Sequence, residues 1–228
     1  MAAAPRLLDA TMNLTSLFEL AAPIMLRATA LTLLFAVAAM VFGLALGGVV
    51  ALVRVLEAPG LKQLAALYVS AFRGTPLLVQ VFIIYYGLPS IGIAFSPITA
   101  GILALTLNVG AYLSESLRGA VSSVGPGQWM AGSSLGMTRV QTLRHVVAPQ
   151  ALRVAVPTLA NSLISLIKDT SLVSVVAVTE LMLATKELIS TTFQPFPLYM
   201  AAAGIYWLLS LAFEQAQRGL ERRLALPR

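Results

Sequence analysis

Long stretches without a charged side chain dominate this sequence. Residues 28–53 and 74–114 contain no Asp, Glu, Lys or Arg, and a helix needs about 20 apolar residues to cross the hydrocarbon core of a bilayer. The second stretch has room for two helices, which separate near Pro89 and again at Pro97. Further apolar stretches follow at 154–167 and 188–213. The pattern predicts an all-α integral membrane protein with a single transmembrane domain over residues 1–228.

Five membrane-spanning helices account for this pattern. We place them at about 24–53, 62–88, 97–119, 153–170 and 197–217, with an irregular re-entrant or surface segment between the last two. Cytoplasmic loops carry an excess of Lys and Arg. One side of the predicted membrane has Arg54 and Lys62, then Arg118, Arg139, Arg144 and Arg153, then Arg218, Arg222, Arg223 and Arg228, against Arg6, Arg27 and Lys186 on the other. We therefore expect a multi-pass protein with a cytoplasmic C-terminus and an external N-terminus.

Composition supports a bilayer environment and excludes several chemistries. The chain is 58% hydrophobic and 11% charged, whereas soluble domains are about 45–50% apolar and about 25% charged. Its net charge of +6 is spread thinly between apolar blocks, so no nucleic-acid surface is expected. The absence of cysteine and the single His145 leave no basis for a metal site. We find no convincing catalytic pair and no phosphate-binding G-x-x-x-x-G-K-[ST] motif, so no catalytic residue is expected.

The loop at about 120–152 is too polar to span a membrane, and its pattern is specific. Residues 128–135 read as a short helix, and Gly136 is a natural helix stop, where a positive φ is favourable. Two interpretations fit. The loop is an amphipathic element on the lipid surface, or it is a docking element for a cytoplasmic partner. The residues alone leave both open.

A second helix is predicted after Gly136. Thr138 and Gln141 have the spacing of a capping box, and Pro149 is expected to end the helix, with Pro157 a kink in the next one. Its buried face is expected to comprise Val140, Leu143 and Val147. Elsewhere, Gly43 and Gly47 form a small-residue face for close helix contact, either within the chain or with a second copy.

Several patterned stretches follow one another in the sequence, at 72–80, 111–119, 127–138, 146–153 and 165–172. Together they resemble the polar amino-acid permeases of ABC importers, of the histidine/glutamine type, and those at 127–138 and 146–153 resemble the EAA loop of that family. Residues 83–89 and 205–207 favour the cystine branch. The resemblance implies the bacterial inner membrane, an ABC ATPase dimer that holds ATP and Mg²⁺, a second or sister permease, and an extracytoplasmic amino-acid-binding protein. It implies no cofactor on this chain.

The resemblance also assigns a coupling helix that contacts the ATPase. Its residues here are Gln128, Trp129, Met130, Ala131, Gly132, Leu135 and Gly136. The family usually has Glu and Ala where this chain has Met130 and Gly132. The missing carboxylate removes a charge-assisted contact. A sister permease that keeps the Glu, or simple sequence drift, would explain the difference.

Charges within the predicted spans are candidates for function, because one at the bilayer centre costs about 2.5–3.5 kcal/mol on insertion scales. We expect Arg73, Lys168 and Asp169 to pair with one another or to face a water-filled path, and Glu115 to pair with Arg118. The candidate path residues are Asn108, Tyr112, Gln80, Asn161, Lys168, Asp169, Thr170 and Arg73. The alternative is a structural polar cluster that joins the second span to the fourth.

The residues also allow a transporter of a different class. The chain could be a self-sufficient secondary carrier or channel for a small zwitterionic solute, in which Lys168 and Asp169 bind a coupling ion. The lack of an inverted repeat and the presence of the polar loop at 120–152 disfavour it.

Overall fold

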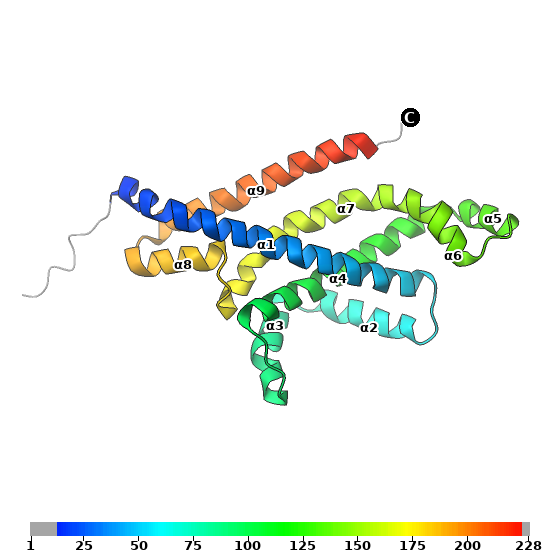
Figure 1. Ribbon diagram of the computed structural model, residues 1–228, viewed down its shortest axis with the longest axis horizontal. Helices are drawn as coiled ribbons and strands as arrows, with labels where there is room; N and C mark the ends of the chain where they lie inside the picture. The colour runs from blue at the N-terminus through cyan, green and yellow to red at the C-terminus, as the bar shows by residue number, and fades with distance from the viewer. Residues whose placement is uncertain (1–12, 225–228) are drawn as a thin grey trace, which may run out of the picture.

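The computed structural model describes residues 13–224, which form helices and turns with no strand among them (Figure 1). The elements are α1 (Leu14–Val55), α2 (Leu61–Gly74), α3 (Leu77–Phe82), η1 (Ile83–Gly87), η2 (Leu88–Ile91), α4 (Pro97–Ser123), α5 (Pro126–Ser134), α6 (Arg139–Thr142), η3 (Leu143–Val147), α7 (Ala148–Asp169), η4 (Thr170–Val176), α8 (Leu181–Thr192) and α9 (Pro195–Leu224). The predicted all-α class is therefore confirmed. Arg6 and Arg228, which contributed to the predicted orientation, lie outside the described residues, as does the side chain of Arg223.

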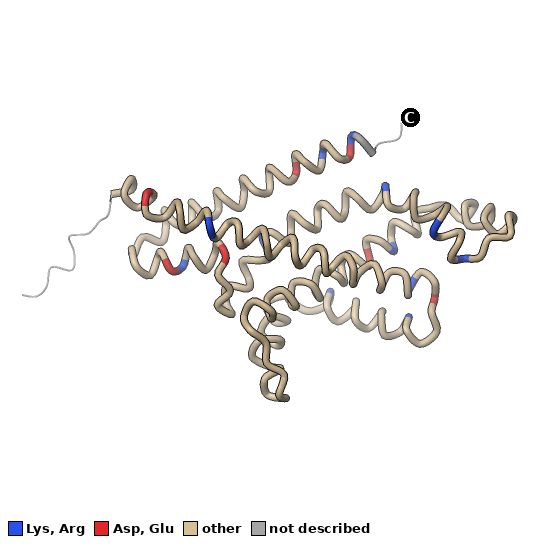
Figure 2. The backbone as a smooth tube through the Cα atoms, in the orientation of Figure 1, with Lys and Arg blue, Asp and Glu red and all other residues tan. Residues whose placement is uncertain are grey.

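The long helices run along the length of the molecule, with α5 and α6 at one end and α8 at the other (Figure 1). Within the described residues, four helices are long and apolar enough to cross a membrane: Leu14–Val55, Pro97–Ser123, Arg139–Val176 and Pro195–Arg222. Charged residues are sparse along their middle portions, and α3 to η2 carry none (Figure 2). We refer to the two ends of the bundle as the α5 end and the α8 end.

The predicted second span, 62–88, is divided in the structure. It bends by 108° between Leu61–Gly74 and Leu77–Ile91, so that α3, η1 and η2 leave the bundle at a steep angle (Figure 1). The cause is Pro76, which disfavours helical geometry in the residue before it, and Thr75 is accordingly extended. The break was not predicted, because the spans were predicted from the length of uncharged, apolar stretches, and residues 74–88 belong to such a stretch.

Proline at position 149 does not end a helix, contrary to the prediction. The chain is helical from Arg139 through η3 and α7, so the predicted fourth span at 153–170 is the later part of a longer element. A proline ring clashes with the carbonyl four residues earlier in a regular α-helix. Here the π-helical turn η3 ends at Val147, two residues before Pro149, and its wider turn accommodates the ring. Leu143 and Val147 are buried as expected, but Val140 is 56% exposed.

Small residues allow α1 to pack most extensively against α4. Both Gly43 and Gly47 are buried, and they face α4. A Cβ atom on Gly47 would lie 2.7 Å from the carbonyl oxygen of Gly110. The intrachain interpretation of this glycine pair is therefore the correct one.

This close approach makes Gly47 intolerant of a methyl group. We expect Gly47→Ala to cost about 1–3 kcal/mol, the usual cost of overpacking a tight contact, and to lower the thermal unfolding temperature of the purified protein in detergent. Gly48→Ala is the matched control, because a Cβ there meets nothing within 4 Å. Equal unfolding temperatures for the two variants would contradict this packing.

Candidate functional site

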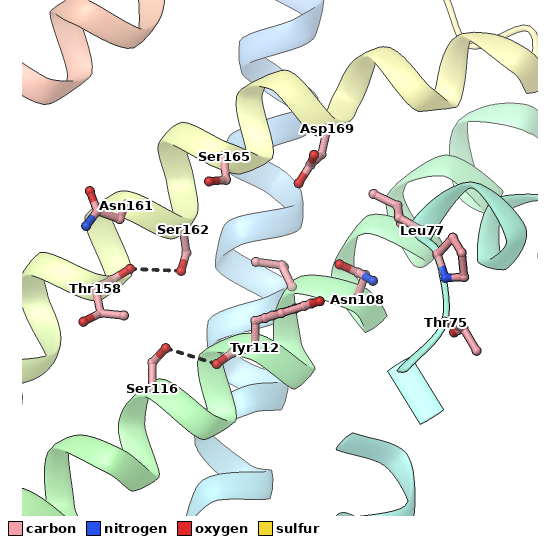
Figure 3. A pocket seen from close by; sticks show the side chains of 12 residues that line it. Thr75, Leu77, Asn108, Tyr112, Ser116, Thr158, Asn161, Ser162, Ser165 and Asp169 are labelled. Atoms are coloured by element: carbon pink, nitrogen blue, oxygen red, sulfur yellow. Dashed lines mark hydrogen bonds between the residues drawn. The ribbon is translucent and has the colours of Figure 1, made fainter. Parts of the chain in front are cut away.

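A polar cavity of about 500 Å³ lies between α4 and α7, next to the break before α3 (Figure 3). Two polar stripes line it. Asn108, Tyr112 and Ser116 lie on one face of α4, and α7 contributes Thr158, Asn161, Ser162, Ser165 and Asp169, while Thr75, Pro76, Leu77 and Val109 complete the lining. Polar residues spaced three and four apart share one helix face. The stripes were therefore visible in the sequence, but only some of their members were selected there.

The structure brings together four of the predicted path residues. Asn108, Tyr112, Asn161 and Asp169 all line the cavity. Lys168 and Thr170 lie outside its lining, as do Gln80 and Arg73. Lys168 is exposed, whereas Thr170 is fully buried, and its hydroxyl donates to the carbonyl oxygen of Ile167 at 2.7 Å.

Gln80 and Asn108 satisfy backbone groups freed at the break between α2 and α3. The Gln80 side-chain amide donates to the carbonyl oxygens of Phe72 at 2.9 Å and Thr75 at 3.1 Å. Asn108 donates to the Gln80 amide oxygen at 3.0 Å and to Phe72 at 3.3 Å. Unpaired backbone groups are costly where water is excluded, so this pair stabilises a break that an unassisted helix would not tolerate.

The cavity combines one carboxylate with several neutral donors. Asp169 is partly buried, and no described residue donates a hydrogen bond to its side chain. Hydroxyls and amides, such as those of Ser165, Asn161 and Tyr112, line the rest. A carboxylate accepts from an ammonium group, and hydroxyl and amide groups can donate to a carboxylate. The arrangement suits a small zwitterion.

A second polar centre forms around Glu115 on α4. Its carboxylate accepts from Arg118 at 2.8 Å, as predicted, and also pairs with Arg54 of α1. Arg73 lies 3.7 Å from the same carboxylate and forms no ion pair with Lys168 or Asp169. The expected pairing of these three charges with one another is therefore wrong, and the alternative, a water-filled path, stays a prediction. The guanidinium carbon of Arg73 lies 5.4 Å from the centre of the Tyr112 ring. The Glu115 carboxylate thus lies near arginine side chains from three helices, α1, α2 and α4.

Two specific caps shape the turn between α5 and α6. Gly136 has a φ of +73°, and the bonds from Met137 N–H to the Gly132 carbonyl and from Gly136 N–H to the Ser133 carbonyl form a Schellman motif. Thr138 and Gln141 form the predicted capping box. The short helix predicted at 128–135 is α5. Pro126 to Thr142 constitute the α5–α6 hairpin.

This hairpin presents apolar side chains away from the bundle. Met130 is 63% exposed and Leu135 is 79% exposed. Trp129 and Met130 border a hollow of about 480 Å³, together with Arg139 and Thr142. Of the other predicted coupling residues, Ala131 and Gly136 are exposed, Gln128 accepts from Gln150 at 3.3 Å, and Gly132 is buried against Thr142. The hairpin thus leaves apolar side chains exposed for contact with a lipid surface or with a partner.

Sequence reasoning missed a buried carboxylate at Glu180. It is fully buried, caps α8 by accepting from the backbone N–H groups of Met182 and Leu183, and accepts from the Tyr206 hydroxyl at 2.8 Å. Thr32 of α1 accepts from the Leu181 N–H at 3.1 Å. These bonds join α8 to α1 and α9. A lone acidic residue before an apolar helix was the available signal.

The chain belongs to the family of binding-protein-dependent transport system inner membrane components, which residues 43–226 match. Its apolar helices and polar cavity fit that class. The resemblance to ABC importer permeases of the polar amino-acid type is thereby confirmed.

Particular relatives make the class more specific. The chain is 44% identical over 185 residues to the L-cystine transport system permease protein TcyB of Bacillus subtilis (strain 168), covering 81% of this chain and 79% of the relative. It is 35% identical over 208 residues to the glutamine transport system permease protein GlnP of Escherichia coli (strain K12), covering 90% and 95%.

Solved structures agree on the fold. A chain in the crystal structure of an amino acid ABC transporter with histidines superimposes with a TM-score of 0.88 at 34% identity, covering 94% of this chain and all of that one. A chain of the inward-facing MetNI methionine ABC transporter gives a TM-score of 0.73 at 18% identity, with the same coverage, which shows a shared fold alone.

Proposed function

We propose that this chain is the membrane-spanning subunit of an ATP-driven importer that carries a polar amino acid across the bacterial inner membrane. The observation that carries the proposal is the polar cavity between α4 and α7, with Asp169 as its one carboxylate. Polar side chains are costly inside a membrane, so such a lining supports a path for a polar solute. The similarity to the permease TcyB favours a cystine-like substrate.

In this proposal Asp169 binds the substrate ammonium group. Asn161 and Tyr112 donate to its carboxylate, since their polar groups line the same space. The amide N–H groups of Asn108 already donate to Gln80 and Phe72, so Asn108 offers only its amide oxygen to the substrate. Arg73 borders the path through its contact with Tyr112. Gln80 and Thr170 support the path through the backbone bonds described above, and Lys168 contributes positive potential beside Asp169.

The α5–α6 hairpin is the proposed coupling element. Its exposed Met130 and Leu135, with the adjoining hollow, would contact a groove on an ATPase dimer. ATP and Mg²⁺ would bind there, because this sequence contains no phosphate-binding loop. Hydrolysis-linked movement of the hairpin would alternate access to the cavity between the two sides of the membrane.

The membrane arrangement follows from the same scheme. We assign five spans, with α2 to η2 counted as one bent span, and place the α5 end in the cytoplasm, where Arg54, Lys62 and Arg144 gather. The α8 end would then meet an extracytoplasmic binding protein. One chain of five helices does not enclose a path, so a second copy or a sister permease completes it.

Copurification tests this assembly directly. The full-length chain, extracted in mild detergent from its native host, should bring down an ABC ATPase and one or two copies of permease, identified and counted by mass spectrometry. Crosslinking in intact cells should add an amino-acid-binding protein, whose bound ligand identifies the substrate. Recovery of the chain with no ATPase under conditions that preserve other ABC complexes would contradict the proposal.

A further inference from the structure

Arg139 joins the α5–α6 hairpin to the end of α1. Its guanidinium donates to the carbonyl oxygen of Val55 at 3.0 Å and lies 3.7 Å from the Glu57 carboxylate. The guanidinium carbon is 6.0 Å from the centre of the Trp129 ring, within the range of a cation–π contact. Val55 is the last residue of α1, and such terminal carbonyls have no partner within their helix. A single side chain therefore contacts α5 and the end of α1 at once.

The end of α1 is joined in turn to the cavity. Arg54, which precedes Val55, pairs with Glu115. The other oxygen of that carboxylate lies 3.7 Å from Arg73, whose guanidinium stands over the Tyr112 ring. Tyr112 lines the cavity. We call Arg139, Arg54, Glu115 and Arg73 the charged linkage, because they connect the hairpin to the cavity through consecutive contacts.

The surroundings of the charged linkage permit it to move. A separate cavity of about 410 Å³ is bordered by Arg54, Arg118, Trp129 and Arg139. The side chains of Arg54 and Glu115 are only 20% and 18% exposed, so their attraction is stronger than that of a surface pair. A partly buried charge that loses one partner is destabilised unless another partner takes its place. A shift of the α1 end is therefore transmitted to Glu115 and its remaining partners.

We propose that the charged linkage couples displacement of the α5–α6 hairpin to the position of Tyr112 in the cavity. The inference rests on the proposed function, in which an ATPase displaces the hairpin. Movement at Arg139 shifts the end of α1. This shift changes the distances from the Glu115 carboxylate to the guanidinium groups of Arg54 and Arg73. Arg73 then moves relative to the Tyr112 ring. The four residues are positioning residues and none of them contacts the transported solute.

Because the sequence contains no cysteine, an introduced cysteine is the one thiol of this chain that a maleimide can label. Thr158→Cys places one thiol in the cavity lining. In the full complex with its ATPase, reconstituted in nanodiscs, the rate of maleimide labelling of this chain is measured with and without ATP and vanadate. We expect a change of about fivefold or more, the usual lower range of coupling between sites. Arg139→Gln should abolish that change while the ATPase remains bound and hydrolyses ATP.

Arg144→Gln is the matched control. It removes the same charge from the same helical stretch, where Arg144 is exposed and forms no ion pair with a described residue. It should keep the full labelling response. Arg73→Gln tests the far end of the charged linkage and should abolish the response as well. The double variant of Arg139 and Arg73 should lose no more than either single variant, since coupled residues act non-additively.

The outcomes separate the two proposals. A normal response in Arg139→Gln, with the ATPase bound, overturns the charged linkage and leaves the proposed function intact. If Arg139→Gln loses the ATPase, Arg73→Gln decides. Arg73 contacts Glu115 and Tyr112, neither of which belongs to the hairpin, and a normal response in that variant overturns the charged linkage. A parent Thr158→Cys complex that binds the ATPase but shows no response to ATP overturns both.

Discussion

Replacing Asp169 by asparagine is expected to reduce uptake of the transported amino acid by about 10- to 100-fold at subsaturating concentration. A hydrogen bond to a charged group is worth about 1.5–3 kcal/mol, and each 1.4 kcal/mol corresponds to a factor of ten in binding. Asp169 is the one carboxylate in the cavity lining. Asn keeps the shape of the side chain but attracts an ammonium group far more weakly.

The measurement is ATP-dependent uptake of radiolabelled L-cystine by the reconstituted complex, over a range of concentrations. Glu187→Gln is the control, because it also neutralises a carboxylate, but on the exposed surface of α8 and outside the cavity. Equal amounts of inserted protein and bound ATPase must be verified for both variants. Uptake by the Asp169 variant that equals that of the control would remove Asp169 from the path and favour its structural role.

The second large effect is expected at Gly132. A Cβ atom there would lie 2.5 Å from both the methyl and the hydroxyl of Thr142. Gly132→Ala should therefore force α5 away from α6. Overpacking of about 1–3 kcal/mol corresponds to a loss of about 5- to 150-fold in an equilibrium such as ATPase docking. ATP-driven uptake should fall accordingly, while insertion into the membrane is retained.

Two further variants make this prediction specific. Gly127→Ala adds the same methyl to the same helix, but at a position with nothing within 4 Å, and should behave like the wild type. Adding Thr142→Ala to Gly132→Ala removes both close contacts and should restore docking in part. Copurification of the ATPase and uptake are measured for each. Full docking by Gly132→Ala alone would show that the α5–α6 contact does not control the interface.

The contact between Gly132 and Thr142 also explains how this chain departs from the related EAA loops. The space that the usual alanine methyl would occupy is taken by the Thr142 side chain. The departure at Gly132 is thus compensated within the hairpin. The structure offers no comparable compensation for Met130, whose side chain is exposed.

Local signals predicted much of the fold and part of the site. Apolar length identified the helices, and the caps at Gly136 and Thr138 were evident because their geometry depends on neighbours in sequence. The scarcity of charge made Asp169 easy to identify. The signal for the break at Thr75, the proline that follows it, was equally local. The prediction used only the apolar length of this stretch and so passed over Pro76.

The remaining features depend on contacts between segments distant in sequence. The partners of Glu115 come from α1 and α2, and only the packing of these helices reveals that Arg54 and Arg73 share one carboxylate. The same holds for Arg139, which was used in the sequence only to predict the orientation and which contacts the end of α1. Sequence spacing predicts contacts along one helix, but it does not predict pairing between helices.

We propose that this chain carries solute only as part of an ATP-driven complex. The most direct test of this proposal is uptake of radiolabelled L-cystine into proteoliposomes that contain the purified chain alone, or the chain with its ATPase, binding protein and ATP. We expect accumulation only in the complete system, and none when ATP is omitted. Uptake by the chain alone, driven by a solute or ion gradient, would contradict it and identify a self-sufficient secondary carrier.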